Sequence, residues 1–185
     1  MPEVKELTIG VLGGTGPLGG GLARRFAVAE RADLVVVAVP YDGHADLLRG
    51  LAGPLAGTIV VDAVNPLGFD KQGAYALEVP EGSAAQQAAA LLPDSRVTAA
   101  FHHVSAPLLL DLAVPAVELD VLVLGEGEDR EAPDTVQALA ELIPGVRGVY
   151  GGRLRNARQV EALTANLIAV NRRYTAHAGI RVTDV

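Results

Sequence analysis

A glycine-rich turn near the start of the chain has the residue types and spacing of a phosphate-binding loop. The segment Gly13–Gly19, GGTGPLG, contains the pattern Gly-x-Gly-x-x-Gly. Glycines let the main chain turn sharply and let a pyrophosphate approach its amides. A helix that starts at Pro17 would add unpaired N–H groups and a partial positive charge. The pattern therefore indicates dinucleotide or other phosphate binding, with an ordinary tight turn as the alternative interpretation.

Two later loops carry the other residues that could do chemistry. Asn65–Leu67 follows one short apolar run, and His102, Val104 and Ala106 follow another. Open α/β sheets bind ligands in loops at the carboxyl ends of their strands. Apolar loops with a few polar side chains suit hydride transfer, which needs two rings held face to face in a dry pocket. We therefore expect such a site here, with a capping or core role for His102 as the alternative.

Other chemistries fit these loops less well. His102 and His103 are adjacent at the end of a predicted strand, where neighbouring side chains point to opposite faces, so the two cannot easily clasp one metal ion. No Gly-x-Ser-x-Gly nucleophile elbow is present. Asp62 and Asp70 could form a carboxylate pair, but aspartates in such loops more often cap turns. We therefore expect no metal site and no obligatory acid or base.

The elements that position these loops alternate between strand and helix. Short apolar runs predict strands at Leu7–Leu12, Leu34–Val39, Thr58–Val61, Val97–Phe101, Val121–Leu124 and Val146–Tyr150. Helices are predicted from Pro17 to about Ala29, at Ala45–Leu55, from the N-cap Ser83 to Leu92, from Pro133 to about Ile143, and at Arg155–Arg173. This alternation predicts the α/β class with a parallel, Rossmann-type sheet and a C-terminal helical extension.

Length and composition limit the remaining possibilities. The 185 residues predict a single domain, in which residues 1–105 form the dinucleotide-binding part and residues 106–185 a C-terminal part with the long helix 155–173. A net charge of −7 gives no sign of nucleic-acid binding. The chain has no Cys and no apolar run long enough to span a membrane, so we expect a cytoplasmic protein.

The long C-terminal helix poses two open questions. Its broad apolar stripe needs a partner surface, which is either the rest of the chain or a second subunit in a homodimer. A local excess of basic residues near it is either a solvated face or a site for an anionic ligand or partner. These residues are Arg153, Arg155, Arg158, Arg172 and Arg173.

Several stretches of the chain closely resemble the NADPH-dependent F420 reductases, also called F420H2:NADP oxidoreductases. The matching stretches follow the family order over nearly the whole chain: IGVLGGTGPLGGGLARR, VVVAVPYDGH, VVDAVNPLGFD, AAFHHVSA, LRNARQVEALTANLIAVNRRY and AHAGIRV. The resemblance implies reversible hydride transfer between NADP(H) and the deazaflavin coenzyme F420, in a cytoplasmic homodimer associated through the final helix.

The resemblance also implies roles for particular residues. The segment Thr15–Leu18 matches the family's pyrophosphate loop, and His102, Val104 and Ala106 match the segment that packs near the deazaflavin. Asn65–Leu67 falls in the loop near the meeting rings. The cofactor-binding residues that we predict are Gly14, Thr15, Gly16, Pro17, Leu18, Gly19, Pro40, Asn65, Pro66, Leu67, His102, Val104 and Ala106.

The chain departs from this family after the first helix. Family members continue into a second strand whose Gly-Ser-Arg-like turn holds the 2′-phosphate of NADP. Here Glu30–Asp33 leads straight into LVVVAV, so roughly 35 residues of strand, helix and strand are missing. Joining the first helix directly to the family's fourth strand would make a left-handed crossover, which is found in about 2% of cases.

Three explanations of the gap are open. LVVVAV could take the place of the second strand, the helix could change face, or the sequence as written could hide a break at or near Ala29–Glu30. We predict the break. A real deletion would remove two charged contacts to the 2′-phosphate and lower the affinity for NADP by roughly a hundred-fold or more.

The gap also keeps two other functions open. One is a catalytically silent protein that binds a dinucleotide or a deazaflavin. The other is an NADPH-dependent reductase with a different acceptor, such as a flavin or a small carbonyl compound.

Overall fold

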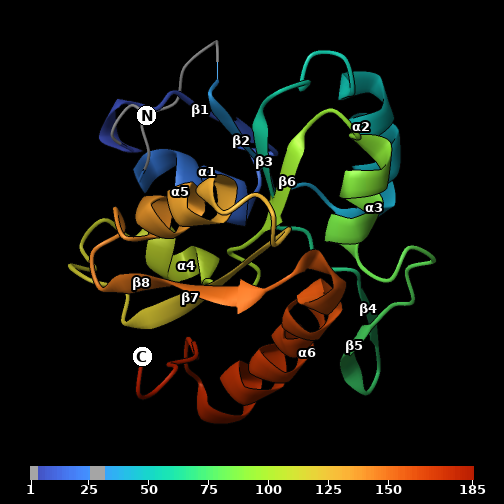
Figure 1. Ribbon diagram of the computed structural model, residues 1–185. Helices are drawn as coiled ribbons and strands as arrows, with labels where there is room; N and C mark the ends of the chain where they lie inside the picture. Colours follow the sequence, from blue (N-terminus) through green and yellow to red (C-terminus); the bar gives the residue numbers. More distant parts are fainter. Residues whose placement is uncertain (1–3, 26–31) are drawn as a thin grey trace.

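A six-stranded sheet forms the centre of the computed structural model, which describes residues 4–25 and 32–185 (Figure 1). The strands lie side by side in the order β1 (Ile9–Leu12), β2 (Leu34–Val37), β3 (Ile59–Asp62), β6 (Arg96–Ala99), β7 (Leu119–Gly125) and β8 (Val146–Gly152). Each of them coincides with a predicted strand. The Rossmann-type α/β class is therefore confirmed.

One pair of neighbouring strands departs from the expected parallel sheet. The first four strands are parallel and β8 is parallel to β7, but β7 runs antiparallel to β6. A parallel neighbour requires a crossover that packs on the sheet, usually a helix. Between β6 and β7 the chain forms only the short helix α4 (Ala106–Leu110), which packs against α1 (Pro17–Arg25). The chain therefore enters β7 at the end of the sheet where β6 finishes, and β7 runs antiparallel to β6.

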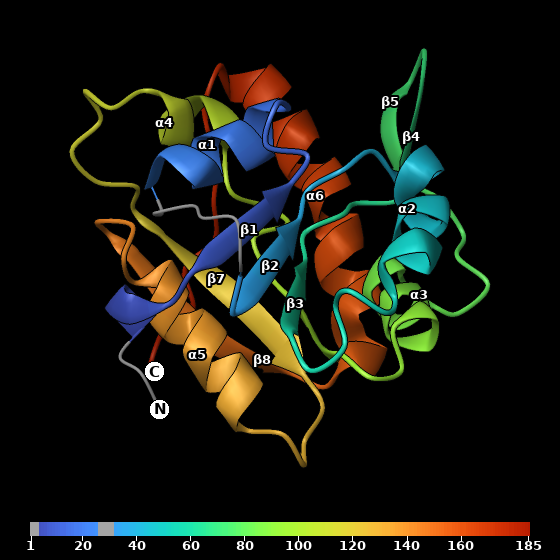
Figure 2. The same cartoon turned by 90° about the horizontal axis from the view of Figure 1, so that it is seen from above.

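Helices cover both faces of the sheet (Figure 2). On one face lie α1, α4 and α5 (Glu131–Ala140), and on the other lie α2 (His44–Leu51), α3 (Ala84–Leu91) and α6 (Ala157–Tyr174). Alternate residues of β2 point to the two sides: Val36 packs in one core with Leu22 of α1, and Val37 packs in the other with Leu48 of α2. All four side chains are fully buried.

The positions of α1 and α2 give one of the first two crossovers an unusual hand. The chain steps from β1 to β2 and on to β3 in one direction, but α1 and α2 lie on opposite faces of the sheet. Two parallel crossovers of this kind have opposite hands, so one of them is left-handed. This agrees with the reversal expected if α1 joins directly to the family's fourth strand. The predicted break at Ala29–Glu30 lies outside the described residues.

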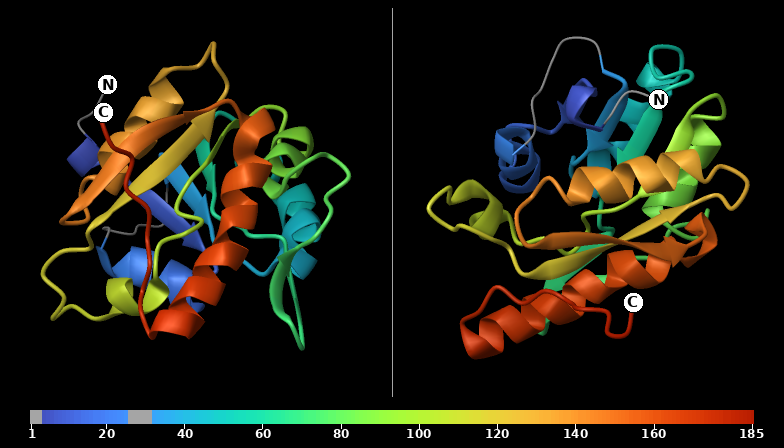
Figure 3. Two further views of the ribbon diagram at one scale, coloured as in Figure 1. Left: turned by 90° about the horizontal axis from the view of Figure 1, so that it is seen from below. Right: turned by 60° about the vertical axis from the view of Figure 1, so that its left-hand side comes forward.

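Three short elements were not predicted from the sequence. The strands β4 (Leu67–Asp70) and β5 (Gly73–Ala76) form an antiparallel hairpin in the turn-rich segment after β3. The hairpin projects from the body of the molecule beside α6 (Figure 3). Helix α4 was also missed. All three elements have five residues or fewer, too few for a clear hydrophobic period.

The predicted helices are present, with shifted ends. Ser83 is the N-cap of α3 as predicted, and its hydroxyl accepts a hydrogen bond from the amide of Gln86 at 3.0 Å. Helix α5 begins at Glu131, before the predicted Pro133, and α6 begins at Ala157 after a 3₁₀ turn, Leu154–Asn156. The other 3₁₀ turns are Val4–Glu6 and Tyr41–Gly43. Within residues 4–25 and 32–185, no helix is long and apolar enough to cross a membrane.

Candidate functional site

The glycine turn joins β1 to α1 and packs tightly against its surroundings. Gly13 has φ +85°, and a Cβ on it would collide with the carbonyl oxygen of Ala38, just after β2. A Cβ on Gly19 would lie 2.5 Å from the Gly13 carbonyl oxygen. Packing within the chain therefore requires glycine at positions 13 and 19, as expected where a helix approaches its strand closely.

Gly14 is different, because the protein itself does not require a glycine there. A Cβ on Gly14 would be 3.5 Å from its nearest neighbour, which is an ordinary contact. Gly14, Thr15 and Pro17 are exposed, and Leu18 is half-buried. The turn thus presents open main chain at the start of α1, which fits the approach of a diphosphate. Pro40, in the exposed loop after β2, follows the segment that packs against this turn.

The loops after β3 and β6 are tied together and to α6. The side-chain amide of Asn65 donates a hydrogen bond to the carbonyl oxygen of His102 at 2.8 Å. The hydroxyl of Thr164 lies 3.0 Å from the same oxygen and 3.3 Å from Oδ1 of Asn65. Thr164 was not predicted as a site residue; its signal in the sequence is a hydroxyl within the apolar stripe of the long helix. Two predicted residues, Asn65 and His102, are thus brought into contact.

His102 is a buried side chain with unused hydrogen-bonding capacity. It is 2% exposed, and neither ring nitrogen has a hydrogen-bond partner within the part of the chain that the structure describes. Burial lowers the pKa of His102 to about 4, so the ring is neutral at pH 7. The preceding residue, Phe101, has φ 66°, a left-handed conformation that is costly for a phenylalanine and is typical of functional sites.

A pocket of about 300 Å³ opens beside His102, and we call it the ring pocket. Three of the predicted residues, His102, Val104 and Ala106, line it, together with α6 and the segment after that helix. The remaining lining residues are His103, Ser105, Pro107, Thr164, Leu167, Ile168, Asn171, Ala176, His177 and Ala178. Its mostly apolar walls with a few polar groups are typical of ligand sites. Pro66 and Leu67 do not line it: buried Pro66 accepts a hydrogen bond from Leu77 at the base of the hairpin that Leu67 begins.

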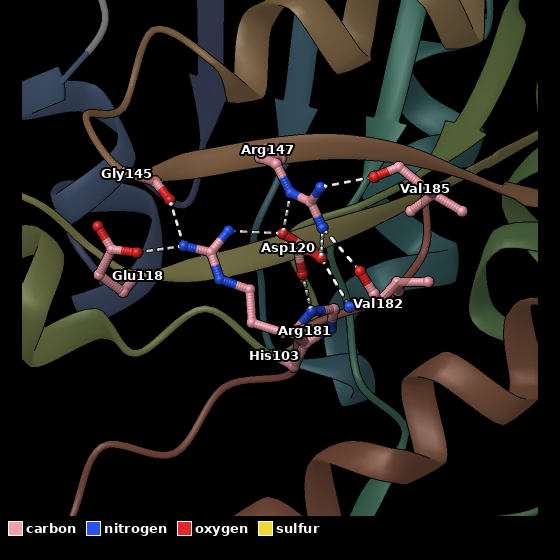
Figure 4. A network of polar contacts seen from close by, with 8 residues as sticks. All are labelled: His103, Glu118, Asp120, Gly145, Arg147, Arg181, Val182 and Val185. Atoms are coloured by element: carbon pink, nitrogen blue, oxygen red, sulfur yellow. Dashed lines mark hydrogen bonds and ion pairs between the residues drawn. The ribbon is translucent and has the colours of Figure 1, made fainter.

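The C-terminal segment forms one wall of the ring pocket and is anchored on β7 by Asp120 (Figure 4). The buried carboxylate of Asp120 accepts hydrogen bonds from Arg147 at 2.6 and 2.8 Å, from Arg181 at 2.8 Å and from the amide of Val182 at 2.7 Å. Arg147 and the other donors hold the pKa of Asp120 far below its usual range. The carbonyl of Asp120 accepts a bond from Nε2 of His103 at 2.8 Å, so the two neighbouring histidines have separate roles.

A second polar group, which was not predicted from the sequence, lies beneath the loops. Nε2 of His44 is 2.6 Å from Oδ2 of Asp62, and both side chains are fully buried. The other oxygen of Asp62 accepts a hydrogen bond from the amide of Val64 and so shapes the loop that carries Asn65. Asp70, its proposed carboxylate partner, instead caps the hairpin turn. The two aspartates therefore have unrelated structural roles.

Glu161 of α6 extends this buried group to the start of α3. Its two oxygens accept hydrogen bonds from the amides of Ala84 and Ala85 at 3.0 and 3.1 Å. Burial raises the pKa of Glu161 to about 7 despite these two bonds. Within residues 4–25 and 32–185, no group of three or more His, Asp or Glu side chains could hold a metal ion.

Comparison with known sequences identifies close relatives. No family model matches the chain. The F420-dependent NADP reductase of Methanothermobacter thermautotrophicus is 32% identical over 231 residues, which cover all of this chain and 98% of the relative. The enzymes of the same name from Methanothermobacter marburgensis and Methanocaldococcus jannaschii are 35% and 36% identical over 168 residues. These alignments cover 88% and 89% of this chain and 74% of each relative.

Comparison with solved structures supports the same fold. A crystal structure from Arthrobacter sp. FB24, described as a candidate F420-dependent NADP reductase, has a TM-score of 0.79 at 23% identity and covers 96% of this chain and 99% of that one. A hypothetical protein from Sinorhizobium meliloti has a TM-score of 0.62 at 23% identity, over 80% and 86% of the two chains. At these identities the likeness shows the fold alone.

The first alignment also bears on the missing segment. It is 231 residues long and this chain has 185, so the relative contains several tens of residues that this chain lacks. The alignment nevertheless covers the whole of this chain at an overall identity of 32%. The chain belongs to the F420-dependent NADP reductase family.

Proposed function

We propose that the protein transfers a hydride between NADP(H) and the deazaflavin coenzyme F420. The observation that carries the proposal is the whole-chain similarity to F420-dependent NADP reductases, together with a built pocket at His102. The open position at Gly14 fits a diphosphate against the main chain, and the two unpartnered nitrogens of His102 fit a polar ring edge. In this proposal residues 1–105 carry the dinucleotide.

The protein's part in the reaction is positioning. The bound coenzymes supply the hydride donor and acceptor. The main-chain amides at the start of α1 hold the diphosphate. Asn65 and Thr164 fix the loop after β6 through the His102 carbonyl, while Val104 and Ala106 keep water out of the ring pocket. The neutral His102 ring can donate one hydrogen bond and accept another, and no side chain has to move a proton.

The glycine turn and the ring pocket lie at the same end of the sheet. Strands β1, β2, β3 and β6 are parallel neighbours, so the loops that follow them all lie at the carboxyl end of the sheet. Helix α1 packs against α4, which begins at Ala106 of the ring pocket. The dinucleotide turn and the ring pocket are therefore joined by one helix pair.

A turnover assay tests this function. Reduced F420 and NADP⁺ are mixed with the protein, and the return of the oxidised deazaflavin absorbance is followed. The proposal expects protein-dependent turnover that reverses with F420 and NADPH. Binding of either coenzyme without turnover would instead indicate a silent binding protein. Oxidation of NADPH only with a flavin or carbonyl acceptor would indicate a different reductase.

The homodimer and the cytoplasmic location belong to the same proposal. Val170 and Tyr174 leave apolar surface exposed at the end of α6, which supports a subunit contact there. The absence of Cys in the sequence fits a reducing compartment. Light scattering should give twice the mass of the chain, and a monomer at micromolar concentration would contradict the dimer.

A further inference from the structure

A second hollow, of about 610 Å³, lies between the β4–β5 hairpin and the C-terminal half of α6. We call it the arginine hollow. The hairpin strand β5 packs beside α6 (Figure 3). The lining residues are Phe69, Asp70, Gln72, Gly73, Ala74, Ile168, Ala169, Arg172 and Arg173. Ile168 lines the ring pocket as well, so the two hollows adjoin along one side of the helix.

The charges in the arginine hollow favour an anion. The side chains of Arg172 and Arg173 are exposed, and neither has an ion pair or a side-chain hydrogen bond among the described residues. Asp70 is the carboxylate that lines the same hollow. Its Oδ1 already accepts hydrogen bonds from the amides of Gln72 and Gly73 at 2.7 and 3.2 Å in the hairpin turn. Two arginines without an ion pair among the described residues and one carboxylate therefore line the hollow, which leaves it with a net positive charge.

The ring pocket is small for a ligand as long as coenzyme F420. At about 300 Å³ it is at the lower end of the range for pockets that enclose a drug-sized molecule, about 300–1,000 Å³. Coenzyme F420 is longer than its ring: the ring carries a ribityl chain that ends in a phosphodiester and glutamates. These groups place several negative charges at a distance from the ring. The adjoining hollow is where such a tail meets positive charge.

We propose that the arginine hollow is the subsite for the anionic tail of the deazaflavin coenzyme, with Arg172 and Arg173 as its phosphate- and carboxylate-binding residues. This inference rests on the proposed function. Guanidinium groups bind phosphate and carboxylate through paired, charge-assisted hydrogen bonds. The diphosphate of the dinucleotide is held at the glycine turn after β1. The two coenzymes thus use separate anion sites.

The test compares F420 with a tail-less deazaflavin that has the same ring and ribityl chain but no phosphate or glutamate. Quenching of deazaflavin fluorescence gives both dissociation constants without turnover. We expect the wild-type protein to bind F420 more tightly. The double variant Arg172→Gln, Arg173→Gln should weaken F420 binding roughly ten-fold or more and leave the tail-less compound unchanged. High salt should also weaken the binding of F420 and leave the binding of the tail-less compound unchanged.

Matched controls make the outcome specific. Arg158→Gln changes an exposed arginine of the same helix outside the hollow, and it should leave both dissociation constants unchanged. Equal binding of the two compounds by the wild type would overturn the subsite while leaving turnover, and so the proposed function, intact. If the double variant weakened the binding of F420 and of the tail-less compound equally, the subsite would also be overturned. Such a result would indicate damage to packing or to a subunit contact. If neither deazaflavin binds, the proposed function fails as well.

Discussion

The surroundings of His102 and His44 give these buried histidines opposite protonation behaviour. Burial lowers the pKa of His102 to about 4, since no anion among the described residues lies within hydrogen-bonding distance of its ring. Burial also lowers the pKa of His44, but the hydrogen bond and charge of Asp62 outweigh burial and raise this pKa above its usual value. His102 is therefore a neutral hydrogen-bonding group for a ligand, whereas His44 is the hydrogen-bonded partner of a buried carboxylate.

The first prediction concerns the acid stability that His102 controls. Its pKa is lower in the folded than in the unfolded chain, so its contribution to stability is present above about pH 6.5 and is lost as the pH falls towards 4. A shift from 6.5 to about 4 corresponds to at most about 3 kcal/mol. His102→Leu cannot take up a proton. Relative to the wild type, its free energy of unfolding should rise by about 2–3 kcal/mol between pH 7 and pH 4.

Urea unfolding at pH 7 and pH 4 measures this difference. The comparison with the wild type is essential, because Glu161 titrates in the opposite sense. The folded-state pKa of Glu161, about 7, is above its usual 4.5, so its contribution is lost as the pH rises through 7. Glu161→Gln should therefore gain stability relative to the wild type from pH 4.5 to pH 8. If the difference in unfolding free energy between either variant and the wild type stayed constant across the pH range, the buried environment assigned to that residue would be wrong.

At the scale of elements, one carbonyl joins two loops and a helix. The His102 carbonyl accepts bonds from Asn65 and Thr164, which hold the loop after β6 against the loop after β3 and against α6. The ring pocket thus owes its shape to a contact between segments that are 62 residues apart in sequence.

The second prediction tests this contact. Thr164→Val keeps the size of the side chain and removes its donor, so the free energy of unfolding should fall by about 1 kcal/mol. The loop then loses one of its two ties, and we expect a several-fold weaker binding of the deazaflavin with unchanged binding of NADP⁺. Fluorescence titration and urea unfolding measure the two effects.

Thr98→Val is a matched control, because its buried hydroxyl donates to the Val60 carbonyl within the sheet at 3.3 Å. It should lower stability without changing the dissociation constant of the deazaflavin. If both variants weakened the binding of both coenzymes to the same degree, the contact at His102 would have no specific role in the ring pocket.

The sequence allowed prediction of those elements that have a strong local signal. The buried strands are continuous apolar runs, and Ser83 caps α3 because its type and its place before the helix specify it. The β4–β5 hairpin and α4 are short and depend on tertiary contacts, so no local pattern indicates them. Asn65 and His102 were predicted as site residues. Their partner Thr164, and the pair His44 and Asp62, follow only from folding.

At the scale of the whole molecule, β1 lies at the edge of the sheet next to β2. Residues 26–31 alone separate the end of α1 from the described segment that leads into β2, and a strand–helix–strand unit needs about 30 residues. The longer relative has several tens of additional residues. One of the two crossovers that join β1, β2 and β3 is left-handed, which agrees with such a segment belonging between α1 and β2.

The third prediction is that the chain as written discriminates weakly between NADP⁺ and NAD⁺. A strand beside the outer edge of β1 would supply the turn that recognises the 2′-phosphate in a complete Rossmann sheet. Calorimetric titration should give dissociation constants within about ten-fold of each other. A preference for NADP⁺ of a hundred-fold or more would contradict the prediction and would place a 2′-phosphate site elsewhere in the chain.

The fourth prediction concerns the continuity of the chain at Ala29–Glu30. Cleavage of the protein after arginine would release FAVAER, residues 26–31, if the sequence is continuous. We predict that peptide mapping of the protein from its natural source finds other peptides between Arg25 and Ala32 in place of this one. Detection of FAVAER as a single peptide would refute a hidden break and make the deletion real.

The most direct measurement of the central claim is a crystal structure of the protein with both NADP⁺ and F420 bound. We expect the diphosphate against the main chain of Gly14–Leu18 and the deazaflavin ring in the pocket at His102, with the reacting carbons of the two rings in contact. Density for the dinucleotide away from the glycine turn, or for the deazaflavin ring outside that pocket, would contradict it.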